Sequence, residues 1–408
     1  MRAYPVDDRK RACSADGMSA RPFDLFDLDA QLSAEERAVR DTVRRFVDDK
    51  VMPRVASWYR EGSFPWELVP DFAELGLLGA PLHTHGCAGM NATAYWLALR
   101  ELERADSGIR SFVSCQTSLA MVPIAHFGSD AQKDRWLPAL QQGKAIGCFG
   151  LTEPDAGSDP AAMRTRATQV AGGWVLSGIK RWITNGSRAD VAVVWARTGD
   201  DASSIRAFLV PRGAPGFTQT PMNKKLSFRC SDTAELTFDD VKLPEDALLP
   251  ESQGLGSALK CLFEARGGIA FAVCGSAAAS LQCALEFTQS RLAFGKPLAG
   301  MQLVQGKLAT MGVELAKAQL VALSLARLKE AGKLEPVQVS VAKMNNVRMA
   351  LEVTRSCRDI LAANGITEEY PVMRHMNNLE TVSTYEGTND VHLLVIGQFL
   401  TGLSAFRG

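Results

Sequence analysis

The sequence lacks the two glycine-rich signatures of the common nucleotide-binding enzymes. No G-x-G-x-x-G motif follows a predicted strand, and Gly254-Leu255-Gly256 has no third glycine at the required spacing. The motif G-x-x-x-x-G-K-[ST] is absent as well. These absences disfavour a Rossmann-type NAD enzyme and a P-loop nucleotide triphosphatase.

Paired metal or redox motifs are also absent. The nine cysteines are scattered and form no C-x-x-C pair, which is typical of free thiols in a reducing compartment. His83 and His85 are the only close histidine pair, and no cysteine or carboxylate cluster accompanies them. We therefore expect no metal site.

Charge and hydropathy exclude other classes. Forty-five basic residues balance 45 acidic residues, so nothing favours nucleic acid or an anionic membrane as a partner. No apolar run approaches the length of a membrane span, and we expect no membrane partner. The first twenty residues lack the apolar stretch of a secretory signal. We expect residues 1–21 to be a disordered lead-in, with Met1 or Met18 as the start, and a cytoplasmic protein, or one of the mitochondrial matrix in a eukaryote.

A chain of 408 residues is long enough for two or three subdomains. Residues 22–147 carry helical periodicity, with capping boxes at Ser33-x-x-Glu36 and Ser129-x-x-Gln132 and a further helix near 92–104. Residues 148–251 alternate β-rich runs with Gly, Asn and Pro turns, as in a small barrel or sandwich. Residues 252–408 hold long periodic stretches at 257–290, 302–332 and 335–361, which suit a four-helix bundle. The predicted class is α+β, mostly α.

One carboxylate stands out near the end of the chain, in Tyr385-Glu386-Gly387-Thr388. Glu386 fits two hypotheses. It is either an ordinary acid in the first turn of a helix, stabilised by the helix dipole, or a catalytic base held where the backbone turns. In the second case Gly387 allows a ligand to approach closely.

Two further stretches could contact a ligand. The loop that follows an apolar strand at 148–151 contains Thr152, Gly157 and Ser158, whose hydroxyls and backbone amides could hold a polar cofactor, although the loop alone could be a plain turn. Trp182 and Thr184 place a hydroxyl beside an aromatic face. The alternative for Trp182 is a core residue of a strand.

Four stretches together resemble the acyl-CoA dehydrogenases, a family of FAD enzymes with helical, β and helical parts in that order. They are GLTEPDAGSD (150–159), WITNGS (182–187), RLAFGKPLAGMQLVQGKLATM (291–311) and NGITEEYPVMRHMNNLETVSTYEGTNDVH (364–392), and they occur in the family's order over about 23–405. The resemblance implies FAD as cofactor, an acyl-CoA thioester as substrate, a homotetramer, and electron-transferring flavoprotein as the usual acceptor.

The resemblance also assigns roles residue by residue. Positions that match flavin contacts within one subunit are Phe149, Leu151, Thr152, Gly157, Ser158, Trp182, Thr184 and Thr388. Positions that match contacts to the flavin of the neighbouring subunit are Arg291, Phe294 and Gln302. Glu386 matches the catalytic base. Ser158, Arg266 and Tyr385 match positions near the substrate.

Within the family, RELERADSGIRS (100–111) and STYEGTNDVH (383–392) are similar to glutaryl-CoA dehydrogenases. The likeness implies that Arg110 binds the free carboxylate of a glutaryl chain, with Glu103 and Ser111 beside it, and that oxidation is followed by decarboxylation to crotonyl-CoA. A guanidinium can pair with a carboxylate through two parallel hydrogen bonds. The alternative for Arg110 is a structural cation paired with Asp106 one turn earlier.

Three departures from the subfamily keep other substrates open. Ala362-Ala363 replaces a pair of glycines, Phe263 stands where a polar residue contacts the pantetheine arm, and the loop 83–93 differs. The alternatives are another short-chain acyl-CoA, or an acyl-carrier-protein thioester in a biosynthetic pathway. A flavin monooxygenase needs no carboxylate base, and a non-catalytic flavoprotein needs none either, so Glu386 argues against both.

Overall fold

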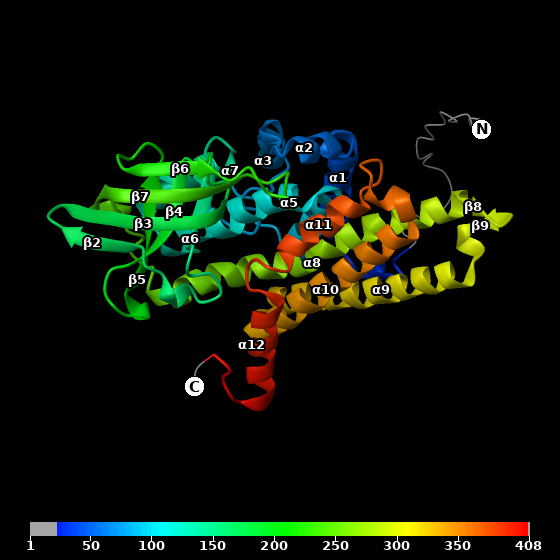
Figure 1. Ribbon diagram of the computed structural model, residues 1–408. Helices are drawn as coiled ribbons and strands as arrows, with labels where there is room; N and C mark the ends of the chain where they lie inside the picture. Colours follow the sequence, from blue (N-terminus) through cyan, green and yellow to red (C-terminus); the bar gives the residue numbers. More distant parts are fainter. Residues whose placement is uncertain (1–22, 407–408) are drawn as a thin grey trace.

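The structure, a computed structural model, describes residues 23–406. The predicted lead-in 1–21 and the alternative start at Met18 lie outside the described residues. A helical part, a β-sheet and a second helical part follow one another along the chain, and the sheet lies at one end of the molecule (Figure 1). The predicted class, α+β and mostly α, is confirmed.

The N-terminal helices begin where the sequence places capping residues. Ser33 caps α1 by accepting a hydrogen bond from the Glu36 N–H at 3.1 Å, and Glu36 Oε2 accepts from the Ser33 N–H at 2.8 Å. Ser129 and Gln132 cap α7 in the same way. With short 3-10 and π segments labelled η, the elements are η1 Leu28–Gln31, α1 Ala34–Phe46, η2 Val47–Val51, α2 Val55–Glu61, η3 Trp66–Leu68, α3 Val69–Glu74, α4 Ala92–Ala105, α5 Ser107–Ser114, η4 Cys115–Met121, α6 Val122–Phe127 and α7 Asp130–Gln141.

Asp106 separates α4 from α5. It ends the first helix and caps the second, with an extended backbone and a side chain that accepts from the Gly108 N–H at 2.7 Å. The chain therefore changes direction here. Arg110 lies on the second helix, one turn beyond the break, rather than on a continuation of α4.

In the described part of the chain, seven strands form one curled sheet in the order β1-β4-β2-β3-β7-β6, with β5 paired to β4. The β1–β4 pair is parallel, whereas the long β3–β7 pair is antiparallel with register shifts. The elements are β1 Gly147–Gly150, η5 Pro160–Ala162, β2 Arg166–Val170, β3 Gly173–Thr184, β4 Val191–Arg197, η6 Ala202–Ser204, β5 Ile205–Pro211, β6 Phe217–Pro221, β7 Thr233–Pro244 and η7 Glu245–Ala247.

The C-terminal part is built around the long helix α8, which begins three residues before the predicted start at 257. α8 packs closely on α4, and a side chain at Gly275 would meet the Arg100 carbonyl oxygen at 2.2 Å. The elements are α8 Gly254–Ser290, β8 Leu292–Ala293, β9 Lys296–Pro297, η8 Leu298–Gly300, α9 Gln302–Glu330, α10 Pro336–Ile360, η9 Ala362–Ile366, α11 Val372–Val382 and α12 Asn389–Thr401. Figure 1 shows the β8–β9 hairpin at the end of the molecule opposite the sheet, and α12 projecting from the bundle.

Two of these helices are more apolar than the sequence reading suggested. By length and composition, α8 and α9 could each cross a membrane. The most apolar window of α8 is 72% buried inside the fold, and that of α9 is 39% buried. The apolar composition of α8 is thus used to pack the molecule's own core.

The first of the two alanines that replace glycines is conformationally costly. Ala362 has a φ of 50°, in the left-handed region that disfavours residues with a Cβ. Ala362→Gly should therefore stabilise the FAD-loaded protein by about 1 kcal/mol, or roughly 1–2 °C in apparent melting temperature. Ala363 has no positive φ, so Ala363→Gly should leave the melting temperature unchanged or lower it. Equal shifts for the two variants would contradict this account.

Candidate active site

Glu386 lies in the short loop between α11 and α12 and not in a helix. Thr388 is the N-cap of α12, accepting from the Val391 N–H at 3.2 Å, and Asp390 is the acid of the first turn. The hypothesis that Glu386 is an ordinary first-turn acid is therefore wrong. Glu386 and Gly387 both have positive φ values, 51° and 92°. A side chain at Gly387 would meet the His392 ring nitrogen at 2.9 Å, so glycine is required there.

Two basic side chains of the helical bundle, Lys343 and Arg266, donate hydrogen bonds to the backbone of this loop. Lys343 on α10 donates from Nζ to the carbonyl oxygens of Tyr385, at 3.1 Å, and Gly387, at 2.7 Å. Arg266 on α8 donates from Nε to the Glu386 carbonyl at 2.7 Å. Three successive carbonyls thus accept hydrogen bonds from two side chains of the bundle. Arg266 therefore contacts the predicted base directly, and whether it also contacts substrate stays a prediction.

Glu386 is half-buried, and one of its two carboxylate oxygens is shielded from solvent. Its Oε2 atom is buried and, among the described residues, has no hydrogen-bond partner. Burial raises the pKa of Glu386 to about 6, although Arg266, Arg110 and Lys343 act in the opposite direction. A carboxylate with such a pKa is ionised at neutral pH and is a stronger base than an exposed glutamate.

Arg110, Glu103 and Tyr385 form a buried cluster beside the loop. Arg110 Nε donates to Glu103 Oε2 at 2.8 Å, and Arg110 Nη2 donates to the Tyr385 hydroxyl. Ser107 and Ser276 donate to the other oxygen of Glu103. Within residues 23–406, Arg110 Nη1 donates to no acceptor, so this nitrogen can bind a ligand.

The alternative prediction, that Arg110 pairs with Asp106, is wrong. Asp106 does not accept from the guanidinium. Its carboxylate caps α5 and accepts from Asn378 Nδ2 at 2.8 Å, with Arg374 Nε at 3.5 Å. The balancing charge for Arg110 is instead Glu103, seven residues earlier.

Cys115 connects this cluster to the sheet. Its thiol lies 3.8 Å from Ser111 Oγ and interacts with both Thr184, at the end of β3, and Glu386. Burial raises the pKa of Cys115 to about 11, so the thiol is neutral at physiological pH. Of the predicted residues, Ser111 contacts this buried thiol, and Thr184 and Glu386 are close enough to influence its pKa.

The predicted cofactor loop after β1 is tied to the sheet by a buried ion pair. Lys180 Nζ donates to Glu153 Oε1 at 2.8 Å and to the Leu151 carbonyl at 3.0 Å. Glu153 also accepts from two backbone N–H groups, those of residues 164 and 165. Phe149 on β1 and Leu151 directly after it are buried, Thr152 is half-buried, and Gly157 and Ser158 are exposed. A fixed loop that presents amides and hydroxyls can bind a polar ligand.

Trp182 is not a core residue. It has a φ of 65°, lies at a register shift of β3 between Lys180 and Ile183, and is 57% exposed. A bulge of this kind redirects a side chain out of the strand's normal alternation. Trp182 thus offers an open indole face two residues before Thr184.

The three residues predicted to reach another subunit lie far from Glu386. Phe294 is in the β8–β9 hairpin and 98% exposed, with Arg291 before it and Gln302 after it, both also exposed. Arg266 touches Glu386 near the start of α8, and 24 residues of helix separate it from Ser290, a length of about 36 Å. Figure 1 shows the hairpin at the opposite end of the molecule from the sheet. These residues cannot serve the site of their own chain.

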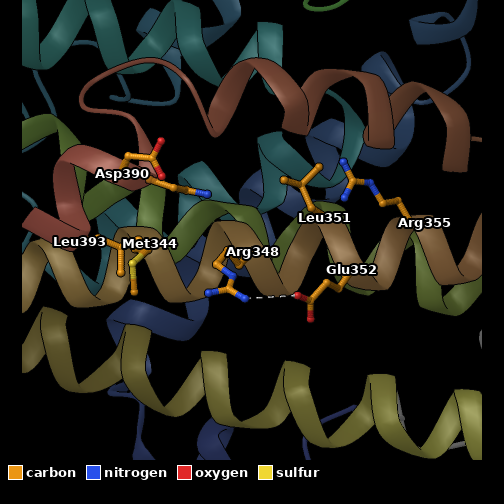
Figure 2. Close-up of a pocket in the computed structure, with 8 residues that line it drawn as sticks. Met344, Arg348, Leu351, Glu352, Arg355, Asp390 and Leu393 are labelled. Carbon is orange, nitrogen blue, oxygen red and sulfur yellow. Dashed lines mark ion pairs between the residues drawn. The ribbon is translucent and has the colours of Figure 1, made fainter. Parts of the chain in front are cut away.

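A separate hollow of about 400 Å³ lies between α10 and the start of α12, directly after Thr388 (Figure 2). It is lined by Met344, Arg348, Leu351, Glu352, Arg355, Asn389, Asp390 and Leu393. Arg348 and Glu352 form a loose ion pair of 4.0 Å there. All four ionisable side chains of this hollow are exposed, so it offers no desolvated acid or base.

These features fit a bound flavin. An exposed indole, a neighbouring hydroxyl and a fixed polar loop come from the sheet, and the loop before α12 contributes a buried carboxylate oxygen without a partner among the described residues. Within the described residues, no three His, Cys, Asp or Glu side chains cluster as metal ligands, and the eight described cysteines form no disulfide. The aromatic and polar groups suit an organic redox cofactor.

Comparisons with known proteins agree with this arrangement. Models of the acyl-CoA dehydrogenase N-terminal, middle and C-terminal domains match residues 33–144, 148–241 and 252–401. The chain therefore belongs to the acyl-CoA dehydrogenase family, and its cofactor is FAD.

Individual relatives differ in their named substrates. A glutaryl-CoA dehydrogenase structure from Mycobacterium smegmatis, in complex with FADH2, is 52% identical with a TM-score of 0.93, covering 95% of this chain and all of that one. A second from the same organism is 57% identical with a TM-score of 0.91, covering 93% and 98%. The mitochondrial short-chain specific acyl-CoA dehydrogenase of Mus musculus is 37% identical, covering 91% of each chain.

Sequence reasoning missed Lys343 and Cys115. Lys343 had a detectable signal, because it falls at helical spacing with the apolar residues Val339, Ala342 and Ala350 of α10. A lysine on such a stripe is buried and needs partners. Cys115 gave no signal, since a buried free cysteine is ordinary in any core.

Proposed function

We propose that the protein oxidises glutaryl-CoA and decarboxylates the product to crotonyl-CoA. The single observation that carries this proposal is the fully buried Arg110, whose Nη1 is free for a ligand beside Tyr385 and the predicted base. A buried cation next to an acyl site suits a substrate that carries its own carboxylate. The higher identity to the two glutaryl-CoA dehydrogenases supports the same substrate.

In this proposal Glu386 performs the acid–base step. Its carboxylate takes the proton from the carbon next to the thioester carbonyl, and the C–H electron pair moves toward that carbonyl. Negative charge then develops on the carbonyl oxygen and needs a hydrogen-bond donor. Among the described residues the Glu386 backbone N–H donates to no acceptor, so it can provide that hydrogen bond.

When bound, FAD would supply the acceptor for the hydride of the β-carbon, so that a carbon–carbon double bond forms in the substrate. The candidates for holding FAD within one chain are the predicted contacts on the sheet and Thr388. The protein also has to keep water out, and the buried Oε2 atom of Glu386 supports this requirement.

Decarboxylation follows from the position of the second carboxylate. In the unsaturated thioester, the bond to the distal carboxylate can break with loss of CO2, because the remaining electron pair is delocalised into the thioester carbonyl. Protonation of the terminal carbon then gives crotonyl-CoA. The ion pair with Glu103 limits how strongly Arg110 holds the carboxylate, which favours release of CO2.

A second candidate is the dehydrogenation of a short-chain monocarboxylic thioester such as butyryl-CoA. It is supported by the similarity to the mouse short-chain enzyme and by Glu103, which already neutralises Arg110. An acyl-carrier-protein thioester remains a variant of this candidate, motivated by Phe263. The two functions differ in whether CO2 appears.

Product analysis tests the proposal. The FAD-loaded protein is given glutaryl-CoA with an artificial electron acceptor, and crotonyl-CoA and CO2 are quantified against substrate consumed. We expect one CO2 for each crotonyl-CoA. If the unsaturated dicarboxylic thioester forms without CO2, the protein is a dehydrogenase of glutaryl-CoA but not a decarboxylase. Turnover of butyryl-CoA alone would favour the second candidate.

We also propose that the protein is a homotetramer in which each FAD contacts two subunits, with electron-transferring flavoprotein as electron acceptor. The helix α12 buries only His392 and exposes Leu393, Leu394, Phe399 and Leu400, and Leu403 just after the helix is exposed as well. A monomer rarely exposes so large an apolar patch. Phe294 in the distant hairpin is similarly exposed.

This assembly makes flavin retention depend on subunit contacts. Phe294→Asp should weaken the assembly and release FAD, because the site would lose the contacts that the second subunit provides. Leu226→Asp, at a residue 87% exposed in the loop between β6 and β7, is the control. Light scattering and the flavin absorbance of the same column fraction measure both quantities. A monomer that retains FAD would contradict the shared site.

A further inference from the structure

Lys343 is an unusual residue for its position. Its side chain is fully buried in α10, yet it makes no ion pair shorter than 4 Å with any described carboxylate. Both of its hydrogen bonds go to backbone carbonyls on either side of Glu386. A buried ammonium group is costly unless it is well hydrogen-bonded. The two backbone carbonyls provide the hydrogen bonds that stabilise Lys343 in this buried position.

The two hydrogen bonds set the direction of the neighbouring amides. When the Tyr385 carbonyl points toward Lys343, the N–H of the same peptide unit, which belongs to Glu386, points away from it. The Gly387 carbonyl is held in the same way, and Arg266 holds the carbonyl between them. Glu386 stays in the left-handed region, which a residue with a Cβ leaves unless the surroundings fix it.

The charge of Lys343 acts on the carboxylate as well. Burial lowers the pKa of Lys343 to about 7, while Glu386 raises it and Arg266 lowers it further. Lys343 in turn lowers the pKa of Glu386. The charged or titratable groups that face this loop come from α8, α10, α5, η4, α12 and the loop itself: Arg266, Lys343, Arg110, Cys115, His392 and Tyr385.

We propose that Lys343 is a positioning residue for the dehydrogenation step. It fixes the left-handed backbone at Glu386, turns the Glu386 N–H toward the thioester carbonyl, and helps to keep the carboxylate ionised. The inference rests on the proposed role of Glu386 as the base, and it adds a residue that touches neither substrate nor flavin.

Lys343→Met tests it, because methionine has a similar length and no charge. Lys343→Gln is the second variant, in case methionine prevents folding, and it can still donate to one carbonyl. Lys317→Met is the matched control, since Lys317 lies exposed on α9 in a surface ion pair with Glu314. FAD-loaded proteins are mixed anaerobically with glutaryl-CoA across a range of pH, and the rate of flavin bleaching is recorded.

We expect both Lys343 variants to retain FAD and to reduce it roughly 10–100-fold more slowly, with the smaller loss for glutamine. The acidic limb of the pH profile should move to higher pH, because the base must be ionised and a cation that lowers its pKa has gone. Lys317→Met should match the wild type. A crystal structure of either variant should show Glu386 outside the left-handed region.

Glu386→Gln is measured in parallel to separate the two proposals. If the flavin of Glu386→Gln were bleached at the wild-type rate, the assignment of Glu386 as the base would be overturned. If Glu386→Gln is inactive while both Lys343 variants keep the wild-type rate and pH profile, only the positioning role is overturned. A lower rate with an unmoved pH limb and an unchanged Glu386 backbone would also overturn it, because that is the result of a general packing defect.

Discussion

Glu386→Gln is expected to lower the rate of flavin reduction by about 10²–10⁴-fold, the usual range for loss of a general base. Glutamine has nearly the same shape but cannot accept the proton. FAD and thioester should still bind, because Arg266 and Lys343 hold the backbone of residue 386 rather than its side chain. Anaerobic stopped-flow absorbance with saturating thioester gives the rate directly.

The pH dependence of the wild-type protein should report the same group. The base is active when ionised, so the rate should fall as pH decreases through about 6, the pKa that burial gives Glu386. Asp390→Asn is the matched control, since Asp390 is exposed in the first turn of α12 and should leave the rate and its pH profile unchanged. A Glu386→Gln variant that reduces its flavin at the wild-type rate would remove this residue from the mechanism.

The second large effect is expected at Arg110. Arg110→Ala should lower kcat/KM for glutaryl-CoA by about one to two powers of ten more than for butyryl-CoA, because only glutaryl-CoA has a distal charge. A hydrogen bond to a charged group contributes roughly 1.5–3 kcal/mol, which sets that range. Arg110→Lys should restore part of the difference, since it keeps the charge without the planar fork.

A control for this experiment follows from Glu103. Removing Arg110 alone leaves the Glu103 carboxylate buried without its cation, which destabilises the local fold whatever the substrate. The double variant Arg110→Met with Glu103→Gln removes both charges and keeps the volume. It should retain butyryl-CoA turnover while losing glutaryl-CoA turnover. Equal losses for the two thioesters in every variant would make Arg110 a structural residue and would remove the glutaryl assignment.

Local signals were sufficient for much of the fold. The capping boxes at Ser33 and Ser129 placed two helix starts correctly because their chemistry is contained within four residues. The long helices were visible because apolar periodicity accumulates over many turns. The start of α8 was placed three residues late, since Gly254 and Gly256 resemble a linker in sequence.

Contacts that depend on a break between two helices or on a bulge in a strand could not be predicted from the sequence. The i,i+4 rule paired Arg110 with Asp106, but Asp106 ends one helix and caps the next, so its carboxylate is already used. The alternation of β3 made Trp182 a core candidate, whereas the register shift near it turns the ring outward. Distant residues take part in both cases, because Asn378 also binds the Asp106 carboxylate and β7 pairs with β3 on both sides of the register shift.

The most direct test of the proposed function is the anaerobic addition of glutaryl-CoA to the yellow, FAD-loaded protein. The same titration with butyryl-CoA is run beside it, and flavin absorbance and CO2 are both recorded. We expect glutaryl-CoA to bleach the flavin at the lower concentration and to release CO2. Bleaching by butyryl-CoA with none by glutaryl-CoA would contradict the assignment of Arg110 and the substrate together.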